Sequence, residues 1–92
     1  VDMSSYNELL PYIEELRDAL EQSSVDSLGR LANNIKYTAN SLGLDQLKYA
    51  AFKTELALRK GNIEMAFENA LTVYEEFKVF EKQFILERVI KE

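Results

Sequence analysis

Five polar side chains recur at helical spacing within one short stretch of the chain and are candidates for a working face. They are Arg30, Asn33, Lys36, Tyr37 and Asn40. At about 100° per residue, four of them follow one side of a helix and Lys36 lies at its edge, opposite a stripe of aliphatic residues. The spacing predicts that these side chains face solvent, where they can contact a partner. The polar outer side that every bundle helix needs explains the same pattern.

The residue types that most enzymes use are missing from the chain. It contains no cysteine and no histidine, which excludes disulfides, thiolate chemistry, the usual zinc ligand sets and the commonest general base. Two acidic pairs, Glu14-Glu15 and Glu75-Glu76, remain. Adjacent helix residues point about 100° apart, so neither pair converges on a substrate. The sequence therefore predicts a protein that is not an enzyme, with no metal and no cofactor.

Composition and charge narrow the class further. The chain has 92 residues, 47% of them hydrophobic and 29% charged, which fits one small globular domain. Its net charge is −5 and its basic residues look scattered along the sequence, so nucleic acid is not expected as a partner. No apolar run approaches the roughly 20 residues of a membrane span, and no signal-peptide core lies near the start. A cytoplasmic protein without membrane insertion is expected.

Helix breakers are scarce, and their positions predict an all-α fold. The single proline and three glycines divide the chain into helical stretches. We expect a short helix capped by Ser4-Ser5, a second helix starting at Pro11, a third over about 26–41, a fourth from Asp45 to the stop at Gly61, and a long last helix capped by Asn62.

Short connections force consecutive helices to run antiparallel. The predicted fold is therefore an up-down-up-down four-helix bundle with a short extra N-terminal helix and a long C-terminal helix. Residues 1–92 are expected to form one domain. Val1 and Asp2 before Met3 fit either a cloning remnant or a domain cut from a longer protein. The apolar stripe of the last helix comprises Ile63, Ala66, Phe67, Ala70, Tyr74, Phe77, Phe80 and Phe84.

The end of the last helix is a second candidate surface. Its apolar side chains exceed what a helix end needs unless something covers them. Either Tyr6, Leu9 and Leu10 cover them within the monomer, or a partner helix or second copy does. The residues of this candidate surface are Phe80, Phe84, Ile85 and Val89, with Leu86 and Ile90 beside them.

The segment ANNIKYTANSLGL, residues 32–44, resembles the signature of histidine phosphotransfer (HPt) domains, A-H-x-L-K-G-S-x-x-x-L-G-A. The likeness extends from Pro11 to about Tyr74. Upstream, Pro11 through Leu20 is similar to the family's P-x-x-L-x-x-A-L approach. Downstream, the family's L-x-x-L-x-x-x-L-E-x-x-x-R-x-G-D course is matched at Leu47, Ala51, Glu55, Arg59 and Gly61-Asn62.

In this register, Asn33 stands where the family has its phospho-accepting histidine. The lone pair of an amide nitrogen is delocalised into the carbonyl, so Asn33 cannot act as the nucleophile. Tyr37 replaces a family glycine and fills the space through which a receiver domain would approach. Lys36 keeps the family's cation, and Thr38 keeps a hydroxyl where the family has serine.

The resemblance implies a degenerate HPt module. Such a module would bind a response-regulator receiver domain or a sensor kinase without phosphotransfer, as scaffold, competitor or regulator, through Arg30, Asn33, Lys36, Tyr37 and Asn40. The alternative is a structural helical bundle that no longer binds receivers and dimerises or binds another protein through its C-terminal helix.

Overall fold

The computed structural model describes residues 2–91, and of Lys91 its backbone alone. Its four helices are α1 (Met3–Glu21), α2 (Leu28–Leu42), α3 (Asp45–Arg59) and α4 (Ile63–Lys91). The described residues contain no strand. The all-α architecture predicted from the sequence is confirmed.

Glycines end α2 and α3 as the sequence predicted. Gly43 and Gly61 have φ of 71° and 72°, in the left-handed region that favours glycine. After α2, the amide of Leu44 donates to the carbonyl of Ala39 at 2.9 Å, which closes the last turn. Asn62 then caps α4 by accepting a hydrogen bond from the amide of Met65 at 3.1 Å.

The first helix differs from the expectation. We predicted a short helix before Pro11 and a second one starting there, but α1 runs without interruption through Pro11 and is capped by Asp2 rather than by Ser4-Ser5. The buried residues Leu9 and Ile13 lie on either side of the proline and continue one apolar stripe. Pro11 itself is exposed, so water can hydrate the carbonyl left without its donor. Burial of the stripe overrides the local preference for a break.

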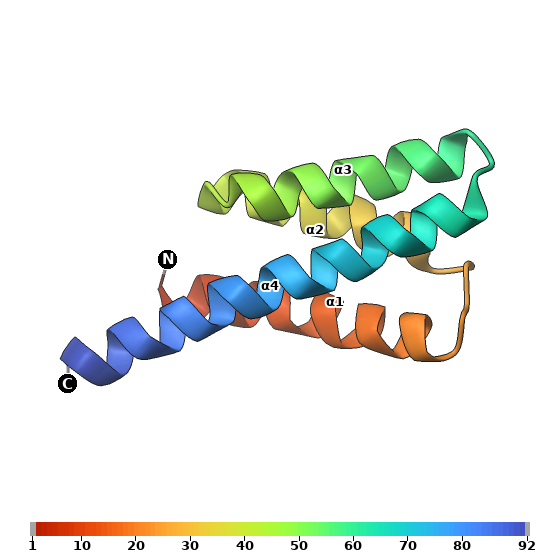
Figure 1. Cartoon of the computed structure of the whole chain (residues 1–92). Coiled ribbons are helices and arrows are strands. Elements are labelled where there is room, and N and C mark those ends of the chain that lie inside the picture. Colours follow the sequence, from red (N-terminus) through yellow and green to blue (C-terminus); the bar gives the residue numbers. More distant parts are fainter. Residues whose placement is uncertain (1, 92) are drawn as a thin grey trace.

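The helices form a ring in which each contacts the next and α4 returns to α1. Their directions alternate (Figure 1), as in the predicted up-down-up-down bundle. One core joins all four helices. Ile63, which we expected to face inward, is 45% exposed at the start of α4. The buried side chains of the shared core include Leu9, Ile13, Leu16, Leu28, Leu31, Ile35, Leu47, Ala51, Val73 and Phe77.

The last helix extends beyond the others at the end of the molecule where α1 begins (Figure 1). There, the ring of Tyr6 stacks on Phe84 with centroids 4.9 Å apart, and Phe84 is only 5% exposed. Phe80 is partly buried against the core. Phe84 therefore belongs to the monomer's interior, because Tyr6 of the first helix covers it, and Phe80 is half-buried beside it.

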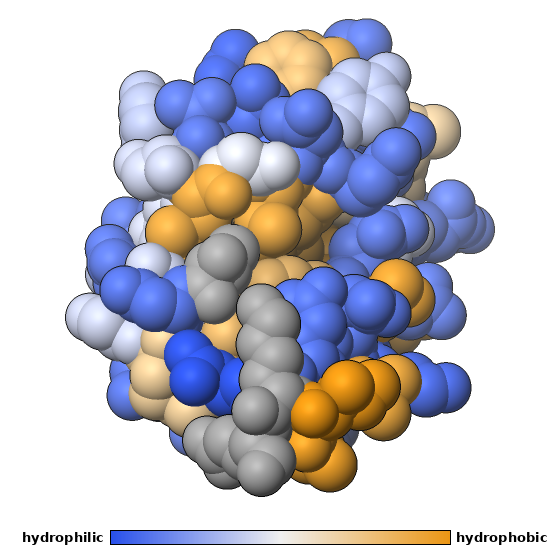
Figure 2. All heavy atoms as spheres, turned by 90° about the vertical axis from the view of Figure 1, so that its left-hand side faces the viewer, coloured by the Kyte–Doolittle hydropathy of each residue, from blue (hydrophilic) through white to orange (hydrophobic). Residues whose placement is uncertain are grey.

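Four other apolar side chains near the end of α4 remain in contact with solvent. Figure 2 faces this end of the molecule and shows hydrophobic side chains gathered in its lower part. We call these four residues the C-terminal patch. They are Ile85, Leu86, Val89 and Ile90, with exposed fractions of 49%, 45%, 68% and 80%.

Replacement of Pro11 by alanine tests how much the interruption costs. Pro11→Ala restores a backbone donor and removes the clash of the ring with the carbonyl of Asn7. We expect the free energy of unfolding to rise by about 1–3 kcal/mol, measured by urea denaturation followed by circular dichroism. Glu8→Ala, at an exposed position of α1, is the control and should change it by less than about 0.5 kcal/mol. A loss of stability in Pro11→Ala would contradict this account.

The hydroxyl of Tyr6 donates to the carboxylate of Glu81. This hydrogen bond, then burial and the charges of Glu81 and Glu14, raises the pKa of Tyr6 to about 12 from its ordinary value of 10.0. A raised folded-state pKa contributes stability that is complete below pH 10 and is lost as the pH rises through about 12. Tyr6→Phe keeps the ring stack and removes this contribution.

We therefore expect Tyr6→Phe to be less stable than wild type by about 1 kcal/mol at neutral pH, with the difference shrinking between pH 10 and 12. Urea denaturation at several pH values measures it. Tyr49→Phe, at a 59% exposed position of α3, is the control and should show no such convergence. A difference that stays constant across this range would refute the assigned hydrogen bond.

Candidate functional site

The five candidate residues of α2 do not form one uniform face. Arg30 pairs with Glu15 of α1, and both side chains are about half exposed. Asn40 accepts a hydrogen bond from the ammonium of Lys48 in α3 at 3.2 Å. The polar side of α2 is therefore divided between its two neighbours, with Arg30 turned to α1 and Asn40 to α3.

Asn33 and Lys36 meet a carboxylate of the neighbouring helix. The amide nitrogen of Asn33 donates to Oε2 of Glu55 at 3.1 Å, and the ammonium of Lys36 lies 2.7 Å from Oε1. The side chains of Lys36 and Glu55 are 19% and 11% exposed. We call these three residues the Glu55 cluster. The expectation that Asn33 and Lys36 simply face solvent is wrong, because both are partly buried between α2 and α3.

The Glu55 cluster favours an ionised carboxylate. Burial raises the pKa of Glu55, but the contacts with Lys36 and Asn33 and the charges of Lys36 and Arg59 outweigh it and leave this pKa below its ordinary value of 4.5. Oε1 of Glu55 forms an ion pair with Lys36, but the angle of this contact does not meet the criteria for a hydrogen bond, and no other group donates to Oε1. The pair is nevertheless close enough to neutralise the ammonium of Lys36.

The cluster can bind and orient, but it lacks a group that could form a covalent bond with a substrate. The amide of Asn33 is committed to Glu55 and has no nucleophilic lone pair. The side-chain nitrogen of Lys36 is engaged by Glu55, 2.7 Å from its Oε1. Among residues 2–91, no three carboxylates or other metal-binding side chains lie together to hold a metal ion.

Tyr37 is well exposed, at 61%. Its ring lies 4.9 Å from the ammonium of Lys36, which is within the range of a cation–π contact. The tyrosine therefore lies beside the Glu55 cluster. The side-chain amide of Asn33 is hydrogen-bonded to Glu55 and not to Tyr37.

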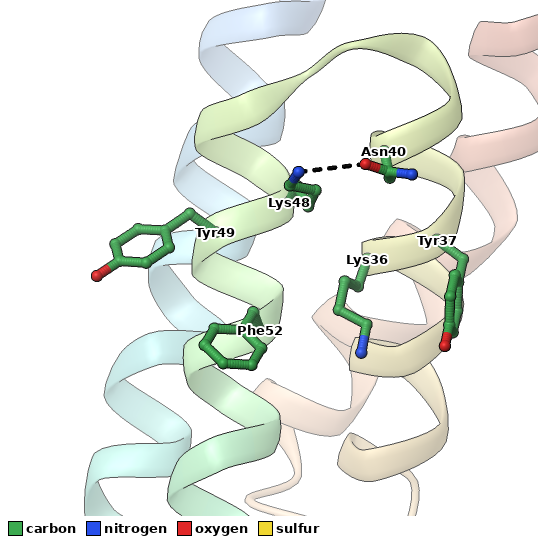
Figure 3. A pocket seen from close by; sticks show the side chains of 6 residues that line it. All are labelled: Lys36, Tyr37, Asn40, Lys48, Tyr49 and Phe52. Atoms are coloured by element: carbon green, nitrogen blue, oxygen red, sulfur yellow. Dashed lines mark hydrogen bonds between the residues drawn. The ribbon is translucent and has the colours of Figure 1, made fainter.

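The structure also brings in residues that the sequence analysis missed. Glu55 appeared there only as a match to the family pattern, although it holds two of the candidates. On the outer side of α3, Lys48, Tyr49 and Phe52 lie opposite Lys36, Tyr37 and Asn40 across a groove of about 250 Å³. Figure 3 shows Lys36 turned toward the space between the two helices and Phe52 on the exposed side of α3 across from it, with the Lys48–Asn40 hydrogen bond at one end. The i, i+3 spacing of Tyr49 and Phe52 was the available signal.

No helix within residues 2–91 is both long enough and apolar enough to cross a membrane.

A model of the Hpt domain family matches residues 6–83. The match covers all of α2 and α3 and parts of α1 and α4, so it includes the Glu55 cluster and all six groove-lining residues. The terminal residues of α4 that form the C-terminal patch lie beyond it. Comparison of the chain with curated proteins and with solved structures found no match.

Removal of the Glu55 charge tests the cluster's contribution to stability. Glu55→Gln leaves Lys36 partly buried without its counter-charge, so we expect a loss of about 1–3 kcal/mol in the free energy of unfolding at pH 7. Glu15→Gln breaks the exposed pair with Arg30 and should cost less than about 1 kcal/mol. Urea denaturation measures both.

The pH dependence of the unfolding free energy is a second test of the same variant, Glu55→Gln. A lowered folded-state pKa contributes stability that is present above 4.5 and lost as the pH falls toward the folded-state value. Wild type should therefore lose more stability than Glu55→Gln when the pH is lowered from 6 to 3. Equal losses in the two proteins would show that Glu55 is not held as an anion.

Proposed function

The chain belongs to the Hpt domain family, and we propose that it is a degenerate member that binds a response-regulator receiver domain without exchanging phosphate with it. Hpt domains are phosphotransfer modules of two-component signalling rather than enzymes proper, and they interact with two-component partners. The observation that carries the proposal is the absence of any histidine in the chain, with Asn33 at the position where the family's acceptor is expected.

The chemistry of phosphate acceptance supports inactivity. Transfer from a receiver requires a nitrogen lone pair that attacks phosphorus while the bond to the aspartyl oxygen breaks. An amide nitrogen does not offer that lone pair. The amide of Asn33 is also turned to Glu55, at 3.1 Å. The chain has no histidine elsewhere to take over the role.

The polar side of α2 supports docking. Arg30, Tyr37 and Asn40 are exposed, and the partly buried Asn33 lies among them. A standard interface buries about 800 Å² on each partner, which is a small part of the 5730 Å² that the chain exposes. Tyr37 is the expected anchor, because exposed aromatic rings supply much of the binding energy at interfaces.

A second candidate function is self-association or binding of another protein through the C-terminal patch. The exposure of Val89 and Ile90, at 68% and 80%, favours it. Removal of residues 79–92 would also remove Phe84, which is buried against Tyr6, so the better test is Val89→Asp with Ile90→Asp. A molecular mass in sedimentation that falls on this double substitution would support the alternative.

Receiver binding is tested with the receiver domains of the same organism. We expect one or more of them to bind wild type, and Tyr37→Ala to weaken that binding about tenfold, which corresponds to about 1.4 kcal/mol. Isothermal titration calorimetry measures the affinity. Leu71→Ala, at a 49% exposed position of α4, is the control and should bind like wild type. If no receiver binds wild type, the proposed function fails.

Restoration of the acceptor tests the position of Asn33. In Asn33→His, Glu55 can accept a hydrogen bond from one ring nitrogen, because its Oε2 already lies 3.1 Å from the nitrogen of Asn33. The other ring nitrogen then keeps its lone pair. Loss of the Tyr37 ring weakens docking but opens the space beside the new imidazole, so we expect Asn33→His with Tyr37→Gly to acquire phosphate from a phosphorylated receiver at high concentration, detected as an acid-labile radiolabel. Asn34→His with Tyr37→Gly is the matched control. Labelling of both proteins to the same extent would refute the assigned position.

A further inference from the structure

The positive charge of the chain is concentrated on one pair of helices. Residues 27–62, which contain α2 and α3, hold six lysines and arginines against two acidic residues, a net charge of +4. The whole chain has a net charge of −5, so the remainder carries −9. Six of the eleven basic residues, which looked scattered along the sequence, lie in this one segment, and its two helices are neighbours in the fold.

The groove on this side is lined by aromatic rings that the core does not use. Tyr37, Tyr49 and Phe52 are 61%, 59% and 39% exposed. In Figure 3, the ring of Phe52 lies over α3 on the viewer's side, opposite Lys36, while Tyr49 extends from α3 away from α2 and Tyr37 lies along the side of α2 away from α3. The hollow of about 250 Å³ is large enough for one or two apolar side chains of a partner.

Two lysines beside this groove keep an unneutralised charge. Lys36 is paired with Glu55. Lys48, by contrast, donates to the neutral oxygen of Asn40, and the ammonium of Lys53 lies over the ring of Tyr49, 5.4 Å from its centroid. Among residues 2–91, no carboxylate forms an ion pair with Lys48 or Lys53. Their charges are therefore available to an acidic partner.

We propose that this groove binds an acidic segment of a partner protein, with one apolar or aromatic side chain between Tyr37 and Phe52 and carboxylates beside Lys48 and Lys53. The inference rests on the proposed function, since it uses the same side of α2, and it adds α3 and the partner's chemistry. Complementary charge speeds the encounter and sets the orientation, while the rings supply the buried contact.

The charge distribution favours a protein segment over the other occupants. A nucleic acid is a long polyanion, and the −9 carried outside residues 27–62 would repel the parts that extend beyond the groove. A second copy could place its acidic α1 and α4 against this side. That contact would be head-to-tail and would not close into a dimer.

The experiment uses three labelled peptides of about 12 residues: one of aspartates and glutamates with a central phenylalanine, the same peptide with serine in place of phenylalanine, and a lysine version with phenylalanine. Fluorescence anisotropy gives the affinities, and amide chemical shifts of the full chain locate the site. We expect the acidic phenylalanine peptide to bind most tightly and to shift the amides of Tyr37, Lys48, Tyr49 and Phe52.

Matched variants assign the binding to the groove. Lys48→Glu and Phe52→Ser should each weaken the peptide about fivefold, whereas Lys82→Glu and Leu71→Ser on α4, which make the same changes at exposed positions, should change it less than about twofold. Unchanged circular dichroism shows that each variant is folded. The affinity should also fall as salt is raised from 50 to 500 mM.

Several outcomes overturn the proposal. Absence of binding at about 1 mM peptide, or equal affinity for the serine peptide, would show that the groove does not bind an acidic apolar segment. Tighter binding of a 12-nucleotide thymidine strand at the same residues would favour a nucleic acid. A concentration-dependent molecular mass that Lys48→Glu abolishes would favour a second copy of the chain. Receiver binding that Tyr37→Ala weakens but Lys48→Glu and Phe52→Ser do not would overturn this inference and leave receiver docking intact. Binding of the acidic peptide without binding of any receiver would overturn receiver docking and leave the groove as a site for an acidic segment.

Discussion

The carboxylate of Glu55 joins α2 to α3 through two polar contacts at the edge of the core. It receives the amide of Asn33 at 3.1 Å and the ammonium of Lys36 at 2.7 Å, and these two residues lie almost one turn apart on α2. These two anchors act together with the buried stripe of Leu28, Leu31, Ile35 and Ala39 to hold the rotation of α2 about its axis. That rotation decides which side chains of α2 enter the core, which meet α3, and which remain in solvent, so the positions of Tyr37 and of the groove follow from it.

The helices and their ends could largely be predicted from the sequence, because the relevant signals are local. Gly43 and Gly61 end α2 and α3 through a left-handed residue, a conformation that glycine adopts at little cost. The prediction of a helix start at Pro11 was wrong, because packing between helices outweighs a local signal there. The proline's local preference for a helix start is outweighed by an apolar stripe that continues through it, from Leu9 to Ile13. Only the contacts of that stripe with other helices decide the outcome.

The candidate site was less predictable, because it depends on pairs of helices. Periodicity places Asn33 on the polar side of α2, but it cannot say that Glu55 of another helix lies 3.1 Å away. For the same reason Tyr49 and Phe52 passed unnoticed, since their importance comes from Lys36 and Tyr37 across the groove. The concentration of positive charge could have been counted from the sequence, over residues 27–62, but the charge was judged over the whole chain. Only the contact of α2 with α3 places it on one side of the bundle.

The persistence of Lys36 and Glu55 has a structural explanation that requires no phosphate. A partly buried ion pair loses stability when either partner is removed, so both residues would be retained for the packing of α2 on α3 even after the acceptor was lost. Their presence therefore does not by itself argue for binding. The aromatic rings do. Tyr37, Tyr49 and Phe52 expose between 39% and 61% of their surface, contribute little to the core, and lie beside the lysines that no carboxylate neutralises within the described residues. A bundle that needed only to fold would gain nothing from this arrangement, whereas one that binds an acidic partner would.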